Sequence, residues 1–449
     1  MRALAWAVGA LVALPLIAYL VLVAVNWNDE PPSADARHLA ALIRDRPPLE
    51  DAANGYIHAL GIAAAADVDP VALGSARSAY IETFVSPPSA GDYPALPGKD
   101  ADYRAARSEA VAALSSACGE ASACADALGA HPDAVASWLA SERWMLERYR
   151  RMLATGAWRE AVPRDAGTPL AGYQHVLEAQ KLHLLAVRQE ALAQDPAAVR
   201  ALLEQDLVFW REAFASSDLL VSKMIAAAAI RRNLGLGNLA LHQLPPERVL
   251  DAVPPSWRQP LTVAERSLAR PLAGEWQVIG AALRMAMAPE AQGGRAAARV
   301  LDRLQRPLYQ EQATLNLFAG WLAGLGRASE SPYPELAQVL GDVGQPQEGA
   351  SLWLRPYNVV GRVLASVAAP AYMSYIARTA DIEGQRRATL LAASLRGAGI
   401  QHEGAATAVR DAPLRSPYDD TPFEWDAAGG AVVFQGLEQG ERGRHAVAL

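Results

Sequence analysis

The N-terminal residues are the feature that most restricts what this chain can form. The run from Ala3 to Val25 contains no charged residue, and it lies between Arg2 and the acidic pair Asp29-Glu30. A helix of roughly 20 apolar residues is long enough to cross the hydrocarbon core of a bilayer. At a rise of 1.5 Å per residue, this run would be about 34 Å long. We therefore expect a membrane-spanning helix at the start of the chain.

The charges on either side of the run predict its orientation. Arg2 precedes the run, whereas Asp29 and Glu30 follow it. The positive-inside rule then keeps the N-terminus in the cytoplasm and places the rest of the chain in the periplasm, outside a bacterial inner membrane. The alternative is a cleaved signal peptide, whose apolar core usually has roughly 7 to 15 residues before an Ala-x-Ala-like site. The run is longer and Val23-Ala24-Val25-Asn26 is a poor cleavage site, which favours a retained anchor.

The chain has two cysteines, Cys118 and Cys124, separated by five residues. In an oxidising compartment, two nearby thiols without other candidates predict a disulfide. The alternative is a pair of free cysteines in a cytosolic protein. A structural zinc site is not expected, because no second cysteine pair completes a tetrahedral shell.

Composition and motifs exclude several classes of function. Hydrophobic residues make up 51% of the chain and charged residues 20%, with a net charge of −7. An acidic chain without clustered basic residues is not typical of a nucleic-acid-binding protein. The chain contains no G-x-S-x-G elbow and no P-loop, and residues 235–240 match G-x-G-x-x-A only within a helical pattern. We expect no cofactor and no metal.

The apolar periodicity predicts a mainly α-helical chain in three parts. Residues 1–28 form the anchor, residues 29–410 an irregular multi-helix domain, and residues 411–449 a small β-hairpin with a loose tail after Gly440. The hairpin is expected at 422–436, around a glycine-bearing loop. Among the expected helices are 169–194, a second starting at Asp195-Pro196, 219–243, 258–288, 308–326 and 356–398, the last broken near Pro370 and Gly384. A stripe of apolar residues also runs along 135–153.

Three ionisable residues, Asp206, Lys223 and Glu275, are the candidates for catalysis. Lys223 is the only charged residue in the apolar stretch 219–230, and a desolvated lysine can act as a base or form a Schiff base. The alternative is a structural ion pair, for which Asp206 on the preceding helix is the expected partner. Glu275 and Glu265 are spaced as two carboxylates for acid–base chemistry, but Arg266 and Arg270 beside them favour ion pairs at helix ends.

Other polar residues have simpler interpretations. His175 and Glu178 share a helical face, but His183 lies roughly 12 Å further along the axis, so one metal ion cannot bind all three. We expect solvent-facing or ordinary helical roles for them. Thr314, Asn316 and Asn358 are polar residues in apolar surroundings. Hydrogen bonds to the backbone at helix ends are expected there, with a functional cleft as the alternative.

Several short sequence motifs are similar to those of a known group of proteins. They are Asn54-Gly55-Tyr56 with Asp69-Pro70, Phe209-Trp210-Arg211, Thr314-Leu315-Asn316, 357–361 (YNVVG) and Ser416-Pro417-Tyr418. The chain resembles uncharacterised proteobacterial proteins that have one N-terminal membrane span and a helical periplasmic domain. The resemblance implies a location and an architecture, and no activity.

The sequence therefore predicts a membrane-anchored periplasmic protein with a structural, accessory or interaction role in the cell envelope. The expected partners are the membrane, through residues 3–25, and an envelope protein. Two alternatives stay open. The first is a membrane-tethered enzyme whose cleft collects Asp206, Lys223 and Glu275. The second is a helical ligand-binding module with a cavity between its helices.

Overall fold

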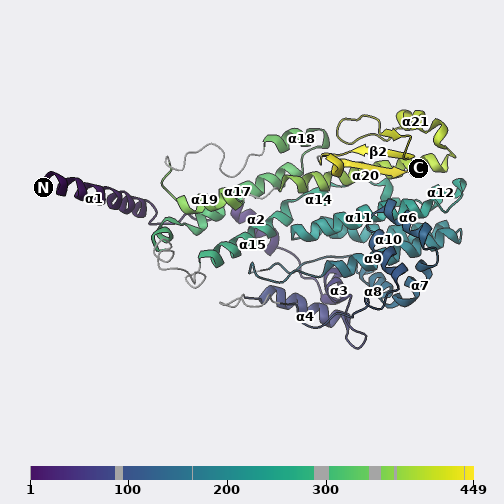
Figure 1. The fold of residues 1–449 in the computed structure, drawn as a ribbon, viewed down its shortest axis with the longest axis horizontal. Coiled ribbons are helices and arrows are strands. Elements are labelled where there is room, and N and C mark those ends of the chain that lie inside the picture. The colour runs from purple at the N-terminus through teal and green to yellow at the C-terminus, as the bar shows by residue number, and fades with distance from the viewer. Residues whose placement is uncertain are drawn as a thin grey trace.

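The computed structural model describes residues 2–85, 95–163, 165–287, 303–342, 355–368, 372–438 and 440–449, without the side chains of 2–10, 12, 367 and 368. The described chain is mainly helical and carries a small antiparallel sheet near its C-terminus, as the sequence predicts. The first helix, α1 (Arg2–Val25), projects from one end of an elongated body formed by the other elements (Figure 1). Among residues with described side chains, no helix combines the length and hydropathy that a membrane span requires.

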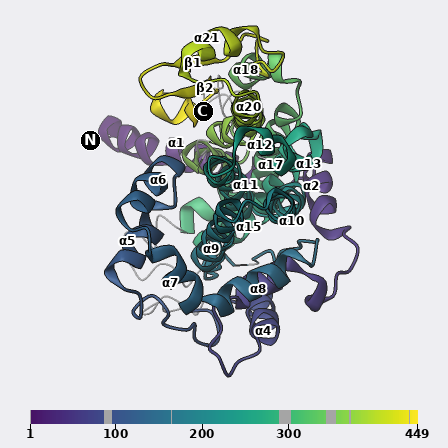
Figure 2. The same cartoon turned by 90° about the vertical axis from the view of Figure 1, so that its right-hand side faces the viewer.

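Four long helices form the centre of the body, namely α9 (Tyr173–Leu192), α10 (Pro196–Ser216), α11 (Leu220–Leu241) and α20 (Met373–Gly397). The predicted pairing of α9 and α10 across a tight connection is confirmed. Asp195 begins α10, because its carboxylate accepts a hydrogen bond of 3.0 Å from the Ala198 N–H. Pro196 follows at the first turn, where its missing N–H is harmless. Helix α11 packs against the other three (Figure 2) and is the expected central, buried helix.

Short helices pack beside the four long helices, several of them on α9 and one on α11. They are η1 (Asp51–Ala53), α3 (Gly55–Gly61), α4 (Pro70–Thr83), α5 (Glu109–Ala117), α6 (Ala121–Ala130), α7 (Ala134–Ser141) and α8 (Arg143–Leu153). The predicted apolar stripe along 135–153 is buried, but it is divided between α7 and α8 at Glu142. The predicted disulfide is confirmed: Cys118 and Cys124 lie at a Sγ–Sγ distance of 1.98 Å, link α5 to α6 and are both fully buried.

A second group of helices lies toward the end of the body that carries α1. It comprises α2 (Ala34–Arg44), α15 (Ala269–Met287), η3 (Arg306–Leu308), α17 (Glu311–Ser329), α18 (Tyr333–Asp342) and α19 (Val359–Ala368). Helices α2, α15 and α17 pack on one another around Leu39, Leu272 and Leu322. This apolar cluster is separate from the larger core around α9, α10 and α11. The body therefore contains more than one core along its length.

The helix expected over 258–288 is divided into several. Helices α13 (Pro255–Arg258) and α14 (Val263–Arg266) precede α15, and α12 (Pro246–Ala252) lies before them. Helix α14 begins with a capping box in which the Thr262 hydroxyl bonds the Glu265 N–H and the Glu265 carboxylate bonds the Thr262 N–H. A capping box defines a helix start, so it interrupts the expected continuous helix.

The expected break of 356–398 at Gly384 is wrong, and Pro370 lies outside the described residues. Gly384 is inside the continuous helix α20. A Cβ atom at this position would lie 2.1 Å from the Phe434 ring. The glycine therefore allows close packing of the C-terminal sheet against the helix, rather than a kink.

The predicted C-terminal hairpin is confirmed and extended by a third strand. Strands β1 (Glu424–Asp426) and β2 (Ala431–Gln435) pair antiparallel, and β3 (Arg444–Ala448) pairs antiparallel with β2. The expectation of a loose tail after Gly440 is therefore wrong, because η5 (Gly440–Gly443) leads directly into β3. The sheet packs on α20, next to α21 (His402–Asp411), through Val432 and Phe434. A hairpin alone is marginal in water, and this packing stabilises it.

Candidate functional site

The residues that follow α1 are bound to distant parts of the chain. The Asn26 side chain is almost completely buried, at 3% exposure. Its amide nitrogen donates hydrogen bonds to the carbonyls of Leu22 at 2.8 Å and Pro356 at 3.0 Å, and its oxygen accepts one from the Asn358 N–H at 2.6 Å. The Gln310 side chain also donates to the backbone carbonyl of Asn26. One residue thus connects the end of α1 to the starts of α17 and α19.

The next residues after α1 continue this connection along α17. The Asp29 carboxylate accepts hydrogen bonds from the N–H groups of Gln312 at 2.7 Å and Ala313 at 2.9 Å, in the first turn of α17. An acidic side chain there satisfies free donors and interacts favourably with the helix dipole. Asn316, one turn further, accepts from the Ser33 N–H at 2.9 Å and donates to the Glu30 carboxylate at 3.1 Å.

Asn358 lies at the centre of the hydrogen bonds that join the end of α1 to α17 and α19. Its side-chain oxygen accepts a hydrogen bond from the Gln310 N–H at 2.9 Å, and its amide nitrogen donates to the Thr314 hydroxyl at 3.0 Å. Its φ of +50° is a left-handed conformation that asparagine tolerates better than most residues. A Cβ atom on Gly361 would lie 1.9 Å from the Thr314 hydroxyl oxygen. The predicted backbone hydrogen bonds at helix ends are therefore confirmed, and we call Asn26, Asp29, Gln310, Thr314, Asn316 and Asn358 the junction cluster.

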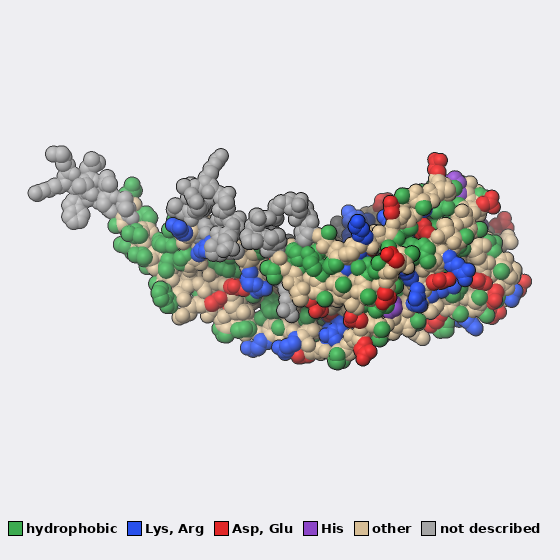
Figure 3. All heavy atoms as spheres, turned by 90° about the horizontal axis from the view of Figure 1, so that it is seen from below, with side chains coloured by type: hydrophobic (Ala, Val, Ile, Leu, Met, Phe, Trp, Pro, Cys, Tyr) green, Lys and Arg blue, Asp and Glu red, His purple; other side chains and the backbone are tan. Residues whose placement is uncertain are grey.

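The surface of α1 differs from that of the body. No described side chain of α1 is buried, and Leu11 and Leu14 are 75% and 67% exposed. Trp27, directly after the helix, is 79% exposed. Figure 3 shows hydrophobic side chains gathered over the part of α1 whose side chains are described, whereas charged side chains are spread over the body. An apolar helix that exposes its sides to water loses the free energy of apolar burial, about 25 cal/mol per Å².

Lys223, the first catalytic candidate, is completely buried on α11. Its ammonium group donates hydrogen bonds to the carbonyls of Phe214 and Glu265, the latter at 2.5 Å, and lies 3.9 Å from the centre of the Phe214 ring. Burial lowers the pKa of Lys223 to about 7, although the nearby Glu265 carboxylate opposes this change. The partners of Lys223 are therefore backbone carbonyls, and the expected ion pair with Asp206 is wrong.

Asp206 has its own set of partners on neighbouring helices. The carboxylate is fully buried and accepts hydrogen bonds from the Tyr149 hydroxyl and from the side-chain amides of Gln180 at 3.1 Å and Asn233 at 2.9 Å. These donors are neutral groups. Their hydrogen bonds offset part of the free energy that desolvation of the buried carboxylate costs. Asp206 thus joins α8, α9, α10 and α11 in the core.

Glu275 has partners different from those of Lys223 and Asp206. It accepts a hydrogen bond of 3.3 Å from the Leu220 N–H at the start of α11, and burial raises its pKa. Glu265 binds the Arg211 guanidinium rather than Arg266 or Arg270. Arg266 donates to the Ser329 carbonyl, whereas Arg270 donates to the Leu42 carbonyl and forms an ion pair with Asp218 at 3.4 Å. Among the interactions of the described residues, none joins Asp206, Lys223 and Glu275 to one another. The structure does not bring the three candidates together.

The helical face with His175 and Glu178 is part of another polar network. The Glu178 carboxylate accepts from Arg107 at 2.9 Å and from the Ser115 hydroxyl at 2.6 Å, and it also pairs with Lys181. Burial raises the pKa of Glu178, but the Lys181 and Arg107 charges outweigh burial and lower it overall. His183 is fully buried and bonds the Leu202 carbonyl at 3.1 Å, which is the ordinary helical role and not the solvent-facing one. In the described part of the chain, no three His, Cys, Asp or Glu residues are arranged to hold a metal ion.

Comparisons with known proteins add no family to this description. No family model matches the chain, and no curated protein and no solved structure is similar to it.

Sequence reasoning found part of the junction cluster and missed the rest. Thr314, Asn316 and Asn358 are conspicuous as polar residues in apolar surroundings. Asn26 appears in the sequence only as a polar residue after an apolar run, and Gln310 has no visible signal. A buried polar residue whose partners lie about 300 positions away has no local pattern that could reveal it.

Proposed function

We propose that this protein is an envelope protein anchored in the bacterial inner membrane by α1, with a rigidly attached helical body that serves an accessory or interaction role in the periplasm. The single observation that carries the proposal is that the exposed apolar helix α1 is joined to the body by the hydrogen bonds of the junction cluster. The sequence from Ala3 to Val25 is uncharged, and the helix α1 that contains it has no described side chain buried against the body.

The junction cluster gives the anchor a specific mechanical property. A flexible linker would allow a tethered domain to reorient freely. Here Asn26 and Asp29, immediately after α1, bind backbone groups at the starts of α17 and α19. The body therefore keeps one orientation relative to α1. In the proposed function, this fixes which of its surfaces face a partner and how far they lie from the membrane.

The positions of the catalytic candidates support a non-catalytic role. Lys223, Asp206 and Glu275 each have separate partners, as described above, and Lys223 and Asp206 are completely buried. A catalytic group has to come within hydrogen-bond reach of a substrate. Their partners are those of core residues that satisfy buried polar groups.

Membrane fractionation tests the anchor. The full chain, expressed in bacteria, is expected to stay with the membranes after alkaline washing, and its mass should include residues 1–25. The double variant Leu14→Arg/Ile17→Arg should leave the membrane, because each arginine costs about 2.5–3.5 kcal/mol at the centre of a membrane helix. A matched control, Val208→Arg/Val221→Arg, changes two exposed residues of the body and should remain membrane-bound.

Topology and partners are tested separately. A reporter that is active only outside the cytoplasm, fused after Leu449, should be active. A photo-crosslinker at Val208 or Val221 should give a discrete adduct with an envelope protein, and this adduct should disappear in the α1 double variant. Wild-type protein that is soluble, a mature chain that begins after Val25, or a C-terminus in the cytoplasm would contradict the anchor. Absence of adducts with a correctly anchored chain would contradict the interaction role.

A further inference from the structure

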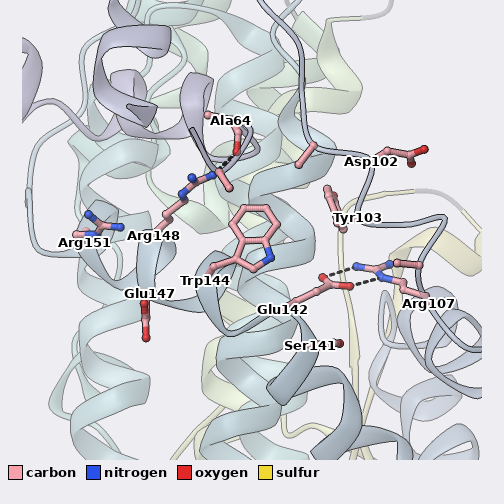
Figure 4. Close-up of a pocket in the computed structure, with 13 residues that line it drawn as sticks. Ala64, Asp102, Tyr103, Arg107, Ser141, Glu142, Trp144, Glu147, Arg148 and Arg151 are labelled. Carbon is pink, nitrogen blue, oxygen red and sulfur yellow. Dashed lines mark hydrogen bonds and ion pairs between the residues drawn. The ribbon is translucent and has the colours of Figure 1, made fainter. Parts of the chain in front are cut away.

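A pocket of about 500 Å³ opens in the body between α8, the residues that connect α3 to α4, and the segment 101–107 (Figure 4). These elements lie away from the end of the body that carries α1 (Figure 1). The pocket volume is in the range of small-molecule sites. Its walls include four alanines, the rings of Tyr103 and Trp144, and charged residues of both signs. The four alanines are Ala64, Ala66, Ala101 and Ala106.

One wall is rigid and its charges are already neutralised. Arg107 makes a bidentate ion pair with Glu142, at 2.6 and 2.8 Å, and also binds Glu178. Its guanidinium lies 5.1 Å from the centre of the Tyr103 ring. The Tyr103 hydroxyl is bonded to His175 at 2.7 Å. This wall fixes the shape of the pocket, and its paired charges leave little free capacity to bind an ion.

The opposite wall carries two arginines, Arg148 and Arg151, that form no ion pair with a described residue. The Arg148 guanidinium donates to the backbone carbonyls of Ala64 at 2.6 Å and Ile62 at 3.1 Å, and it has no ion pair among the described residues. Arg151 follows one turn later on α8, is exposed, and likewise has no acidic partner there. Burial lowers the pKa of Arg148 and the positive charge of Arg151 lowers it further, whereas the Asp69 carboxylate opposes both effects. Two neighbouring guanidiniums that form no ion pair within the described chain favour an anion between them.

The acidic residues of the pocket limit the charge that such an anion can carry. Glu142 is paired with Arg107, and Glu147 is bonded to Arg143 at 3.0 Å. Figure 4 shows the Glu147 and Arg148 side chains extending in opposite directions, with Asp102 at the far side of the pocket. Three carboxylates in one pocket would repel a dianion such as phosphate more strongly than a monoanion. A carboxylate fits the charges better.

The apolar surface next to the arginines indicates what the carboxylate is attached to. Trp144 is partly exposed in the pocket, 6.0 Å from Tyr103 between ring centres, and Arg148 lies 4.7 Å from the centre of its ring. Aromatic side chains and alanine methyl groups offer a surface for a planar apolar group. We propose that this pocket binds a small aromatic carboxylate, with its carboxylate at Arg148 and Arg151 and its ring against Trp144 and the alanines.

Calorimetric titration of the full chain in detergent tests this proposal, with phenylacetate as the probe. Saturable binding of one phenylacetate per chain is expected, and its affinity should fall as salt rises because the contact is ionic. Acetate lacks the ring, benzylamine has the opposite charge, and inorganic phosphate carries a larger charge. Each of the three should bind at least about tenfold more weakly. Acetate loses the apolar contact of the ring, benzylamine loses the charge-assisted hydrogen bonds, and phosphate is repelled by the carboxylates of the pocket.

Variants locate the binding in this pocket. Arg151→Gln should weaken phenylacetate binding about tenfold. Arg151 is exposed and makes no hydrogen bond in the described chain, so this variant keeps the fold. Trp144→Leu should also weaken binding, whereas Arg200→Gln, an exposed arginine on α10, should leave it unchanged. Absence of phenylacetate binding, unchanged binding by Arg151→Gln, or phosphate binding as tightly as phenylacetate would each overturn the proposal. The test does not depend on whether α1 enters a membrane.

Discussion

The backbone N–H of Asn358 donates a hydrogen bond of 2.6 Å to the side-chain oxygen of Asn26, which lies 332 positions earlier in the chain. The Asn26 amide nitrogen bonds the Pro356 carbonyl in the same region. Both contacts are made by the residue that directly follows α1. The helix and the body are therefore joined by specific hydrogen bonds rather than by chain connectivity alone.

The first prediction concerns this contact. Asn26→Ala removes the acceptor of the Asn358 N–H and the donor to Pro356, and it should lower the free energy of unfolding by about 1–3 kcal/mol. Hydrogen exchange of the Asn358 amide, measured by mass spectrometry on the full chain in detergent, should become about tenfold faster. Asn28→Ala is the matched control, because Asn28 is exposed and contributes only its backbone carbonyl to Tyr357. Equal exchange rates in both variants would refute the role of Asn26.

The second prediction concerns close packing between α17 and α19. Gly361→Ala places a Cβ atom 1.9 Å from the Thr314 hydroxyl oxygen and 2.4 Å from the Asn358 side-chain oxygen. The junction cluster has to shift, and the variant should be destabilised by about 1–3 kcal/mol in urea unfolding. Gly129→Ala on α6 is the control, because no atom lies within 4 Å of its added Cβ. Alanine should there stabilise the helix by up to about 1 kcal/mol. A neutral Gly361→Ala would contradict tight packing at the junction.

The third prediction concerns the pH dependence that follows from Lys223. Burial lowers its pKa from 10.5 to about 7 in the folded protein. Between these values the unfolded chain binds more protons, so the free energy of unfolding should rise with pH above about 7. Lys223→Met should remove this increase, which amounts to about 2 kcal/mol between pH 7 and pH 9. Urea unfolding of both proteins at several pH values below the titration of tyrosine measures the difference.

The same comparison separates the structural and catalytic interpretations of Lys223. At pH 7, Lys223→Met should fold and should change stability only modestly, because the methionine fills the space of the lysine stem while two carbonyl hydrogen bonds are lost. Parallel pH profiles of the two proteins would show that Lys223 is not the titrating group. Loss of function in cells with unchanged folding would contradict a purely structural role.

Local sequence patterns were sufficient to predict the elements that depend on interactions between near neighbours in the chain. Asp195-Pro196 is a helix start whose residues carry their own capping group and fixed φ angle, and the structure begins α10 there. Cys118 and Cys124 are close in the chain, so a disulfide needs no long-range information. The third strand was missed for the opposite reason. Residues 444–448 have no strong alternating pattern, and they form a strand because β2 offers a free edge.

The sites depend on tertiary structure. The sequence by itself determined a mainly helical chain, an uncharged apolar N-terminal run, a disulfide and a C-terminal hairpin, because periodicity, capping and short spacing act between near neighbours. Only the tertiary structure decided that Lys223 binds carbonyls instead of Asp206 and that Asn26 meets Asn358. It also decided that Arg148 binds backbone carbonyls and forms no ion pair among the described residues. Each of these depends on which polar groups are desolvated together, and that is set by how helices far apart in the chain pack.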